Sequence, residues 1–137
     1  QESLPAGVLK VSVQEAFSTS RIIALTCPLT DTNRHMINAS TLSMMRSDAI
    51  LINTSRGPLV DDVAVAKALH DGVIAAYCAD VVTIEPPVDG NPLFAEPHCY
   101  TTPHIAWATF DARSRLVGIC AENLKMFLNG TPQNVVS

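Results

Sequence analysis

Residues 49–62, AILINTSRGPLVDD, run from an apolar segment straight into a polar turn and then into the start of a helix. A short apolar segment rich in β-branched residues is typical of a strand that is buried on both faces of a parallel sheet. Arg56 stands where this strand ends and the backbone must bend, so its guanidinium group is placed to bind an anion or a carbonyl oxygen. A solvated arginine in a surface turn is the simpler alternative for any single arginine. The rest of the chain must decide between the two.

The composition fits one globular domain. At 137 residues, 47% of them hydrophobic and 16% charged, the chain can bury a substantial core. Its net charge of -4 argues against a nucleic-acid-binding surface. No apolar run approaches the roughly 20 residues of a membrane helix, and the N-terminal segment lacks the pattern of a secretory signal. We therefore expect a cytoplasmic protein that binds neither nucleic acid nor a membrane.

Helical and strand patterns alternate along the chain. Strands are predicted at residues 21–26, 49–53, 74–82 and 99–102, and helices begin near residues 12, 38, 62 and 110. The connections are long enough for the strands to pair in parallel. The predicted fold class is therefore α/β, the C-terminal half of a doubly wound, Rossmann-like parallel sheet with flanking helices.

Capping residues and apolar stripes support these helices. Candidate N-caps are Ser12, Asn38 or Ser40, Asp61 or Asp62, and Thr109 or Asp111, and glycines 72 and 130 are predicted helix ends. The predicted buried stripe of the third helix is Val63, Val65, Ala66 and Leu69, and that of the fourth is Leu116, Ile119, Cys120, Leu124, Phe127 and Leu128. The four cysteines, at positions 27, 78, 99 and 120, lack the close pairs of zinc or redox motifs, and we expect all four to be reduced and in or near the core.

Reactive side chains follow the predicted strands. Ligands of an open parallel sheet bind beyond the carboxyl ends of its strands. The residues found there are Cys27 and Pro28, then Thr54, Ser55 and Arg56, then Asp80 with Glu85, and last His104 with Ala106 and Trp107. A histidine, a carboxylate that can orient it and an arginine together form a proton-transfer site for an oxo acid.

Three linked motifs extend this interpretation. NTSRGPLVD at residues 53–61, ADVVTIEPP at 79–87 and TPHIAW at 102–107 resemble, in this order and spacing, the signatures of the D-isomer-specific 2-hydroxyacid dehydrogenases. NPLF at 91–94 and AWAT at 106–109 are most similar to the glycerate dehydrogenase (hydroxypyruvate reductase) branch. The resemblance covers the chain from about residue 12 onward.

The resemblance implies an oxidoreductase that transfers a hydride between a nicotinamide cofactor and a small 2-oxo or 2-hydroxy acid, with glycerate and hydroxypyruvate as the expected pair. It implies that Arg56 binds the substrate, that His104 is the acid and base, and that Glu85 orients the imidazole. The cofactor is expected to be NAD, with NADP not excluded, and a homodimer is expected. The implied cofactor-binding residues are Cys27, Pro28, Thr54, Ser55, Arg56, Asp80, His104, Ala106 and Trp107.

One departure from the family pattern concerns the cofactor. The chain contains six glycines and no G-x-G-x-x-G fingerprint, so we expect the glycine-rich unit to precede Gln1 and the chain to be an N-terminally truncated fragment. The expected organisation is one partial dinucleotide-binding domain, residues 1–137. In it, residues 1–108 form α/β units, 109–129 a long helix and 130–137 a tail toward a missing substrate domain. We expect the chain alone neither to bind NAD tightly nor to turn over.

Other functional classes are also considered. A truncated, non-catalytic remnant or dimerisation module that retains the motifs is the main alternative. His98, Cys99 and His104 would make a poor metal site, because adjacent residues of a strand point to opposite faces, and we expect no bound metal. Ser55 does not stand in a G-x-S-x-G elbow, which argues against a serine hydrolase.

Overall fold

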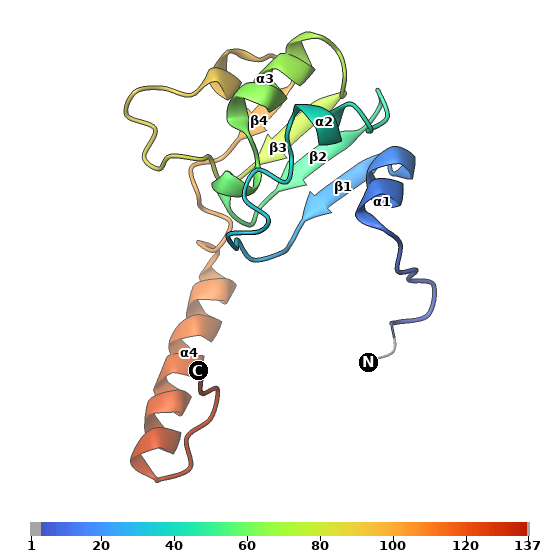
Figure 1. Cartoon of the computed structure of the whole chain (residues 1–137). Helices are drawn as coiled ribbons and strands as arrows, with labels where there is room; N and C mark the ends of the chain where they lie inside the picture. The colour runs from blue at the N-terminus through green and yellow to red at the C-terminus, as the bar shows by residue number, and fades with distance from the viewer. Residues whose placement is uncertain (1–3, 137) are drawn as a thin grey trace. The chain divides into compact units, whose positions relative to one another are not determined.

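The computed structural model describes residues 4–136 of the chain (Figure 1). The chain divides into two compact units, Gln1–Pro103 and His104–Ser137. The first three residues of the N-terminal segment and the last residue of the expected tail lie outside the described residues.

A parallel sheet of four strands forms the centre of the first unit. The strands are β1 (Ile22–Leu25), β2 (Ile50–Asn53), β3 (Ala76–Ala79) and β4 (Cys99–Thr101), and they lie side by side in sequence order. The last residues of the four strands are paired in one row across the sheet: Leu25, Asn53, Ala79 and Thr101. The carboxyl ends of all four strands are therefore level. The predicted α/β fold is confirmed.

Short helices connect the strands. The first unit contains α1 (Val13–Thr19), α2 (Ala39–Leu42) and α3 (Asp62–His70), with 3-10 helices η1 (Gly57–Leu59) and η2 (Pro92–Ala95). The second unit contains α4 (Phe110–Leu128). The helix caps are Ser12, Asn38, Asp61 and Thr109, each of which accepts a backbone N–H bond with its side-chain oxygen. Gly72 and Gly130 have φ values of 70° and 76°, as the predicted left-handed helix ends require.

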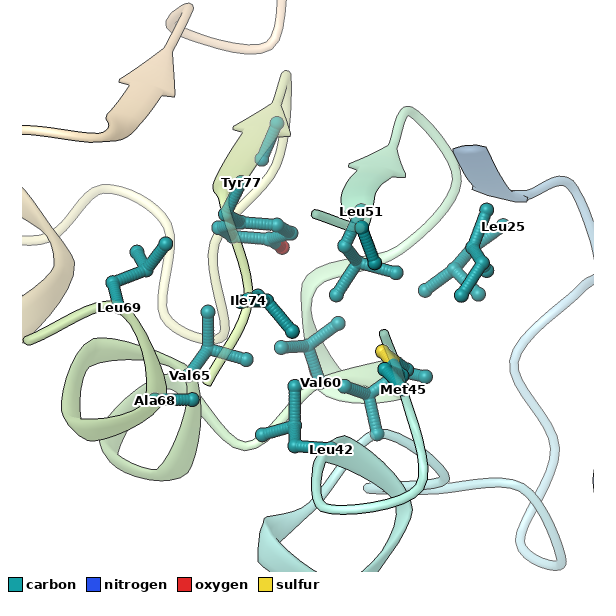
Figure 2. Close-up of a cluster of buried hydrophobic side chains, with 14 of the residues drawn as sticks. Leu25, Leu42, Met45, Leu51, Val60, Val65, Ala68, Leu69, Ile74 and Tyr77 are labelled. Carbon is teal, nitrogen blue, oxygen red and sulfur yellow. The ribbon is translucent and has the colours of Figure 1, made fainter. Parts of the chain in front are cut away.

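The core lies on one face of the sheet. Leu51 and Tyr77 of the strands pack with Val65 of α3 and Leu42 of α2, and all four are almost fully buried (Figure 2). Burial alternates along β1, and Ile22 on its other face is 63% exposed. The prediction of strands buried on both faces is therefore wrong for the chain as described, because the helices of this unit cover a single face.

Two predicted stripes need correction. In α3 the valine at position 63 is 69% exposed, whereas Asp62 is only 8% exposed. Asp61 is the cap, so the helix begins at Asp62 and turns that side chain inward, where it finds hydrogen-bond donors. No residue of α4 is buried, and Cys120 is exposed. The second unit consists of α4 and its flanking segments, which contain no second layer to cover the apolar stripe. The other three cysteines are partly buried, and all four are free thiols.

Candidate active site

A row of hydrogen bonds links the ends of the strands. The Ser55 hydroxyl donates to the Cys27 carbonyl oxygen at 2.5 Å, which joins the segments after β1 and β2. The Asp80 N–H donates to the Asn53 carbonyl oxygen at 3.0 Å, and the Thr102 hydroxyl donates to Oδ1 of Asp80 at 2.5 Å. Three of the predicted site residues, Cys27, Ser55 and Asp80, therefore lie along one hydrogen-bonded edge of the sheet, at the ends of β1, β2 and β3.

The turn that carries Arg56 is held by a buried asparagine. Oδ1 of Asn53 accepts from the Ser55 N–H, and its Nδ2 donates to the Arg56 carbonyl oxygen, both at 3.0 Å. Asn53 is fully buried, whereas Arg56 is exposed and donates from Nη1 to the Ser55 carbonyl oxygen at 2.7 Å. Thr54, between them, is exposed. The backbone is thus fixed from inside while the guanidinium group faces solvent at the sheet edge.

Glu85 lies on an exposed loop beyond β3. Its Oε1 accepts a hydrogen bond from the Val82 N–H at 2.9 Å. Asp80, at the start of the same segment, is buried at 5% exposure. The two carboxylates therefore lie in different surroundings, Asp80 within the hydrogen-bonded edge and Glu85 on the surface. Pro28, on the segment after β1, is also exposed.

His104 opens the second unit. Its φ of 53° lies in the left-handed region, which a residue with a side chain seldom adopts and which concentrates at functional sites. The indole Nε1–H of Trp107 donates to the His104 carbonyl oxygen at 2.8 Å, and the Ala108 N–H donates to the Ile105 carbonyl oxygen at 2.9 Å. These bonds close a compact turn whose side chains, Ala106 and Trp107 included, are exposed.

Two further titratable groups of the sheet are neutral near pH 7 even at their ordinary pKa values, and burial reinforces this. Burial raises the pKa of the Cys99 thiol to about 11, and it raises the pKa of the Tyr77 hydroxyl as well. Neither group therefore supplies a charge near neutral pH. In the first unit, the candidate charges at the carboxyl edge are those of Arg56, Asp80 and Glu85.

Residues 4–136 contain neither a candidate metal site nor a membrane-spanning helix. No cluster of three histidine, cysteine, aspartate or glutamate side chains in this part of the chain could hold a metal ion. Among the same residues, no helix is long and apolar enough to cross a bilayer.

Comparison with known proteins places the chain in a family. Residues 1–106 match the family model "D-isomer specific 2-hydroxyacid dehydrogenase, NAD binding domain". The chain belongs to this dehydrogenase family. The resemblance predicted from the three motifs is thereby confirmed, and the segment is the family's NAD-binding domain.

Two curated relatives and one solved structure illustrate what the chain is similar to. The chain is 41% identical to a hydroxypyruvate reductase from Blautia hydrogenotrophica over 93% of its own length and 39% of the relative's. It is 44% identical to a glycerate dehydrogenase from Methylorubrum extorquens over 92% of its own length and 41% of the relative's. An acyclic imino acid reductase, solved with NADPH and D-Arg, superposes with a TM-score of 0.90 at 29% identity, covering 99% of this chain and 43% of the other. The chain therefore spans about two fifths of these dehydrogenases.

Four residues at this edge escaped the sequence prediction of the site. They are Asn53, Gly57, Asp62 and Asn91: the first three lie against backbone groups, and Asn91 donates to Asp62. Asn53 had a usable signal, since an asparagine that ends an apolar strand and precedes a polar turn is suited to an Asx turn. Asp62 had none, because its two partners lie 21 and 29 residues further along the chain.

Proposed function

We propose that this chain forms part of an oxidoreductase that interconverts a small 2-oxo acid and the corresponding 2-hydroxy acid, with hydroxypyruvate and glycerate as the favoured pair. The observation that carries the proposal is the hydrogen-bonded edge, where Arg56 and Asp80 follow adjacent parallel strands. This is where α/β sheets bind their ligands. Identities above 40% to a hydroxypyruvate reductase, a glycerate dehydrogenase and a glyoxylate reductase support a small 2-oxo acid as substrate, and the NPLF and AWAT segments favour hydroxypyruvate among these acids.

Each catalytic role follows from the chemistry of the side chain. The planar guanidinium fork of Arg56 binds the substrate carboxylate and keto oxygen in two directions at once. The imidazole of His104 gives a proton to the keto oxygen during reduction and takes one from the hydroxyl group during oxidation. Glu85 is proposed as the carboxylate that orients this imidazole in the complete enzyme. The nicotinamide, when bound, supplies or accepts the hydride.

The sheet edge suits the nicotinamide half of the cofactor. Asp80 is a buried acceptor at the end of β3 and fits the amide N–H groups of a nicotinamide. Cys27, Pro28, Thr54 and Ser55 line the neighbouring strand ends, and the turn with Ala106 and Trp107 is proposed to meet the same ring. We propose NAD as the cofactor. NADPH in the similar imino acid reductase makes NADP the alternative to be tested. We further propose a cytoplasmic homodimer for the complete enzyme.

This sequence contains no motif that would bind the pyrophosphate half of the cofactor. A glycine-rich turn opening a helix would provide one, and no G-x-G-x-x-G is present. The chain by itself should therefore bind NADH weakly and should not reduce hydroxypyruvate. Fluorescence titration with NADH and an absorbance assay on the purified chain test both expectations.

A hybrid enzyme tests the function itself. The chain replaces the matching segment of the Blautia hydroxypyruvate reductase, and NADH oxidation is followed with hydroxypyruvate, glyoxylate and pyruvate. We expect turnover with hydroxypyruvate preferred, and a loss of at least a hundredfold in kcat/KM for Arg56→Ala, since it removes a bidentate charged contact worth about 3 kcal/mol or more. Arg46→Ala, which removes an exposed arginine paired with Asp48, is the matched control and should leave activity unchanged. A folded hybrid without turnover would favour the non-catalytic alternative.

A further inference from the structure

One carboxylate oxygen holds both ends of the loop that carries Glu85. Oδ2 of Asp62 accepts a hydrogen bond from the Thr83 N–H at 3.1 Å and another from Nδ2 of Asn91 at 2.6 Å. These two donors bracket the loop of residues 83–91. Asp62 is the first residue of α3 and is 8% exposed, so the bonds form away from bulk water.

The loop has little apolar anchorage. Its two large apolar side chains, Ile84 and Val88, are 69% and 80% exposed, so they contribute little burial. Within the loop, the Val88 N–H donates to the Pro86 carbonyl oxygen, and the Gly90 N–H donates to the Pro87 carbonyl oxygen. Such bonds shape the loop without attaching it to the sheet. Polar bonds at its ends therefore provide much of the attachment: the two bonds to Asp62, and a bond from the Thr83 hydroxyl to the Val60 carbonyl oxygen at 3.3 Å.

Burying the Asp62 carboxylate is unfavourable, because the group loses its hydration. Its other oxygen, Oδ1, has no hydrogen-bond partner within residues 4–136 although it is buried, and a buried carboxylate with an unsatisfied oxygen lowers stability. The N-terminal end of α3 reduces that cost, because the helix dipole favours a negative charge there. Bonds to a charged acceptor are also the stronger kind. The two bonds that the buried carboxylate accepts hold the loop in place.

We propose that Asp62 is a positioning residue that fixes the loop of residues 83–91 and thereby the place of the Glu85 carboxylate. The anchored Thr83 N–H is next in sequence to the Val82 N–H, which donates to Oε1 of Glu85 at 2.9 Å. Holding the first N–H fixes the peptide plane that follows Val82 and so restricts the directions open to the second. The inference rests on the proposed function only for the use made of Glu85, since the anchoring itself is independent of turnover.

Amide hydrogen exchange on the 137-residue chain tests the proposal. Asp62→Ala is expected to speed exchange at the Val82 amide at least tenfold relative to the amides of β2 and β3. The matched control is Asp61→Ala, which removes an equal charge from the adjacent position. It loses the N-cap bond to the Ala64 N–H at 3.0 Å but no bond to the loop. Equal exchange at Val82 in the two variants, after correction by the strand amides, would overturn the proposal.

A second variant covers the case in which Asp62→Ala does not fold. Asn91→Ala removes the donor at the far end of the loop while leaving the carboxylate in place, and it should also speed exchange at Val82 selectively. Unchanged exchange there would count against Asp62 as the anchor. Neither exchange measurement needs cofactor or substrate. An inactive hybrid enzyme would therefore contradict the proposed function, whereas the exchange rate at Val82 alone decides the role of Asp62.

Discussion

Gly57 lies directly against the carbonyl group of Val82, so closely that a Cβ at position 57 would overlap that carbonyl and would come within 2.6 Å of the Thr83 nitrogen. Gly57 follows Arg56 in the sequence, and the Val82 N–H binds the Glu85 carboxylate at 2.9 Å. The backbone of the arginine turn therefore touches the backbone of the glutamate loop. Only a residue without a side chain permits this contact.

Replacing Gly57 by alanine should destabilise the first unit. Two backbone segments would have to separate, which we expect to lower the free energy of unfolding by about 1–3 kcal/mol. Urea denaturation measures the change. The control is Gly118→Ala, because a Cβ on Gly118 of α4 meets nothing within 4 Å and alanine is the better helix former by about 1 kcal/mol. Wild-type stability in Gly57→Ala would contradict the close contact.

Asn53→Ala should loosen the arginine turn. The substitution leaves the Ser55 N–H without this partner, and an unsatisfied backbone group costs about 1–3 kcal/mol. It also removes one of the two bonds to the Arg56 carbonyl oxygen, which keeps the bond from the Leu59 N–H at 3.3 Å. We expect a loss of stability in that range by urea denaturation, together with a raised KM in the hybrid enzyme. Asn38→Ala, which removes the cap of α2, should cost about 1 kcal/mol and leave KM unchanged. An unchanged KM in Asn53→Ala would show that the turn is held without this side chain.

Trp107→Phe should release the backbone of His104. Phenylalanine retains an aromatic ring but lacks the Nε1–H that donates to the His104 carbonyl oxygen at 2.8 Å. Since the left-handed conformation costs about 1–3 kcal/mol for a residue with a side chain, it should become less populated when this bond is lost. The coupling between the amide and α protons of His104, measured by NMR, reports the change. Phe110→Leu, at another exposed aromatic of the second unit, should leave that coupling as in the wild type.

The cysteines should differ in reactivity. The thiolate is the species that reacts with iodoacetamide, and a pKa of about 11 leaves roughly a thousandth of Cys99 ionised at pH 8. Exposed Cys120 should therefore be alkylated well before Cys99, as mass spectrometry of the digested chain would reveal. Burial raises the pKa of the Cys99 thiol from 9.0 to about 11, so as pH rises the thiol loses its proton in the unfolded chain before it does so in the folded chain. The free energy of unfolding should therefore fall as pH rises from about 9 toward 11. Faster labelling of Cys99 would show that its strand opens readily.

The residues of the sheet edge show how far sequence reasoning reaches. The sequence predicts Arg56 and Asp80 as site residues, because each of them follows an apolar strand. The parallel pairing then places both strand ends in one row. The roles assigned to Arg56, Glu85 and His104 stay predictions. The supporting residues were harder to find, since nothing local distinguishes Asp62, which faces the interior, from Asp61, which caps the helix.

The sequence by itself determined the order of the strands, the places where helices begin, the glycine helix ends and the family. These depend on the period of apolar residues, on side chains that bond to their own neighbouring backbone, and on motifs contiguous in the chain. Only the tertiary structure decided that Asp62 rather than Val63 turns inward, that one face of the sheet is covered, and that Gly57 meets Val82. Each of those outcomes depends on contacts with residues that are distant in the sequence, and a local sequence pattern does not show which distant residues will be in contact.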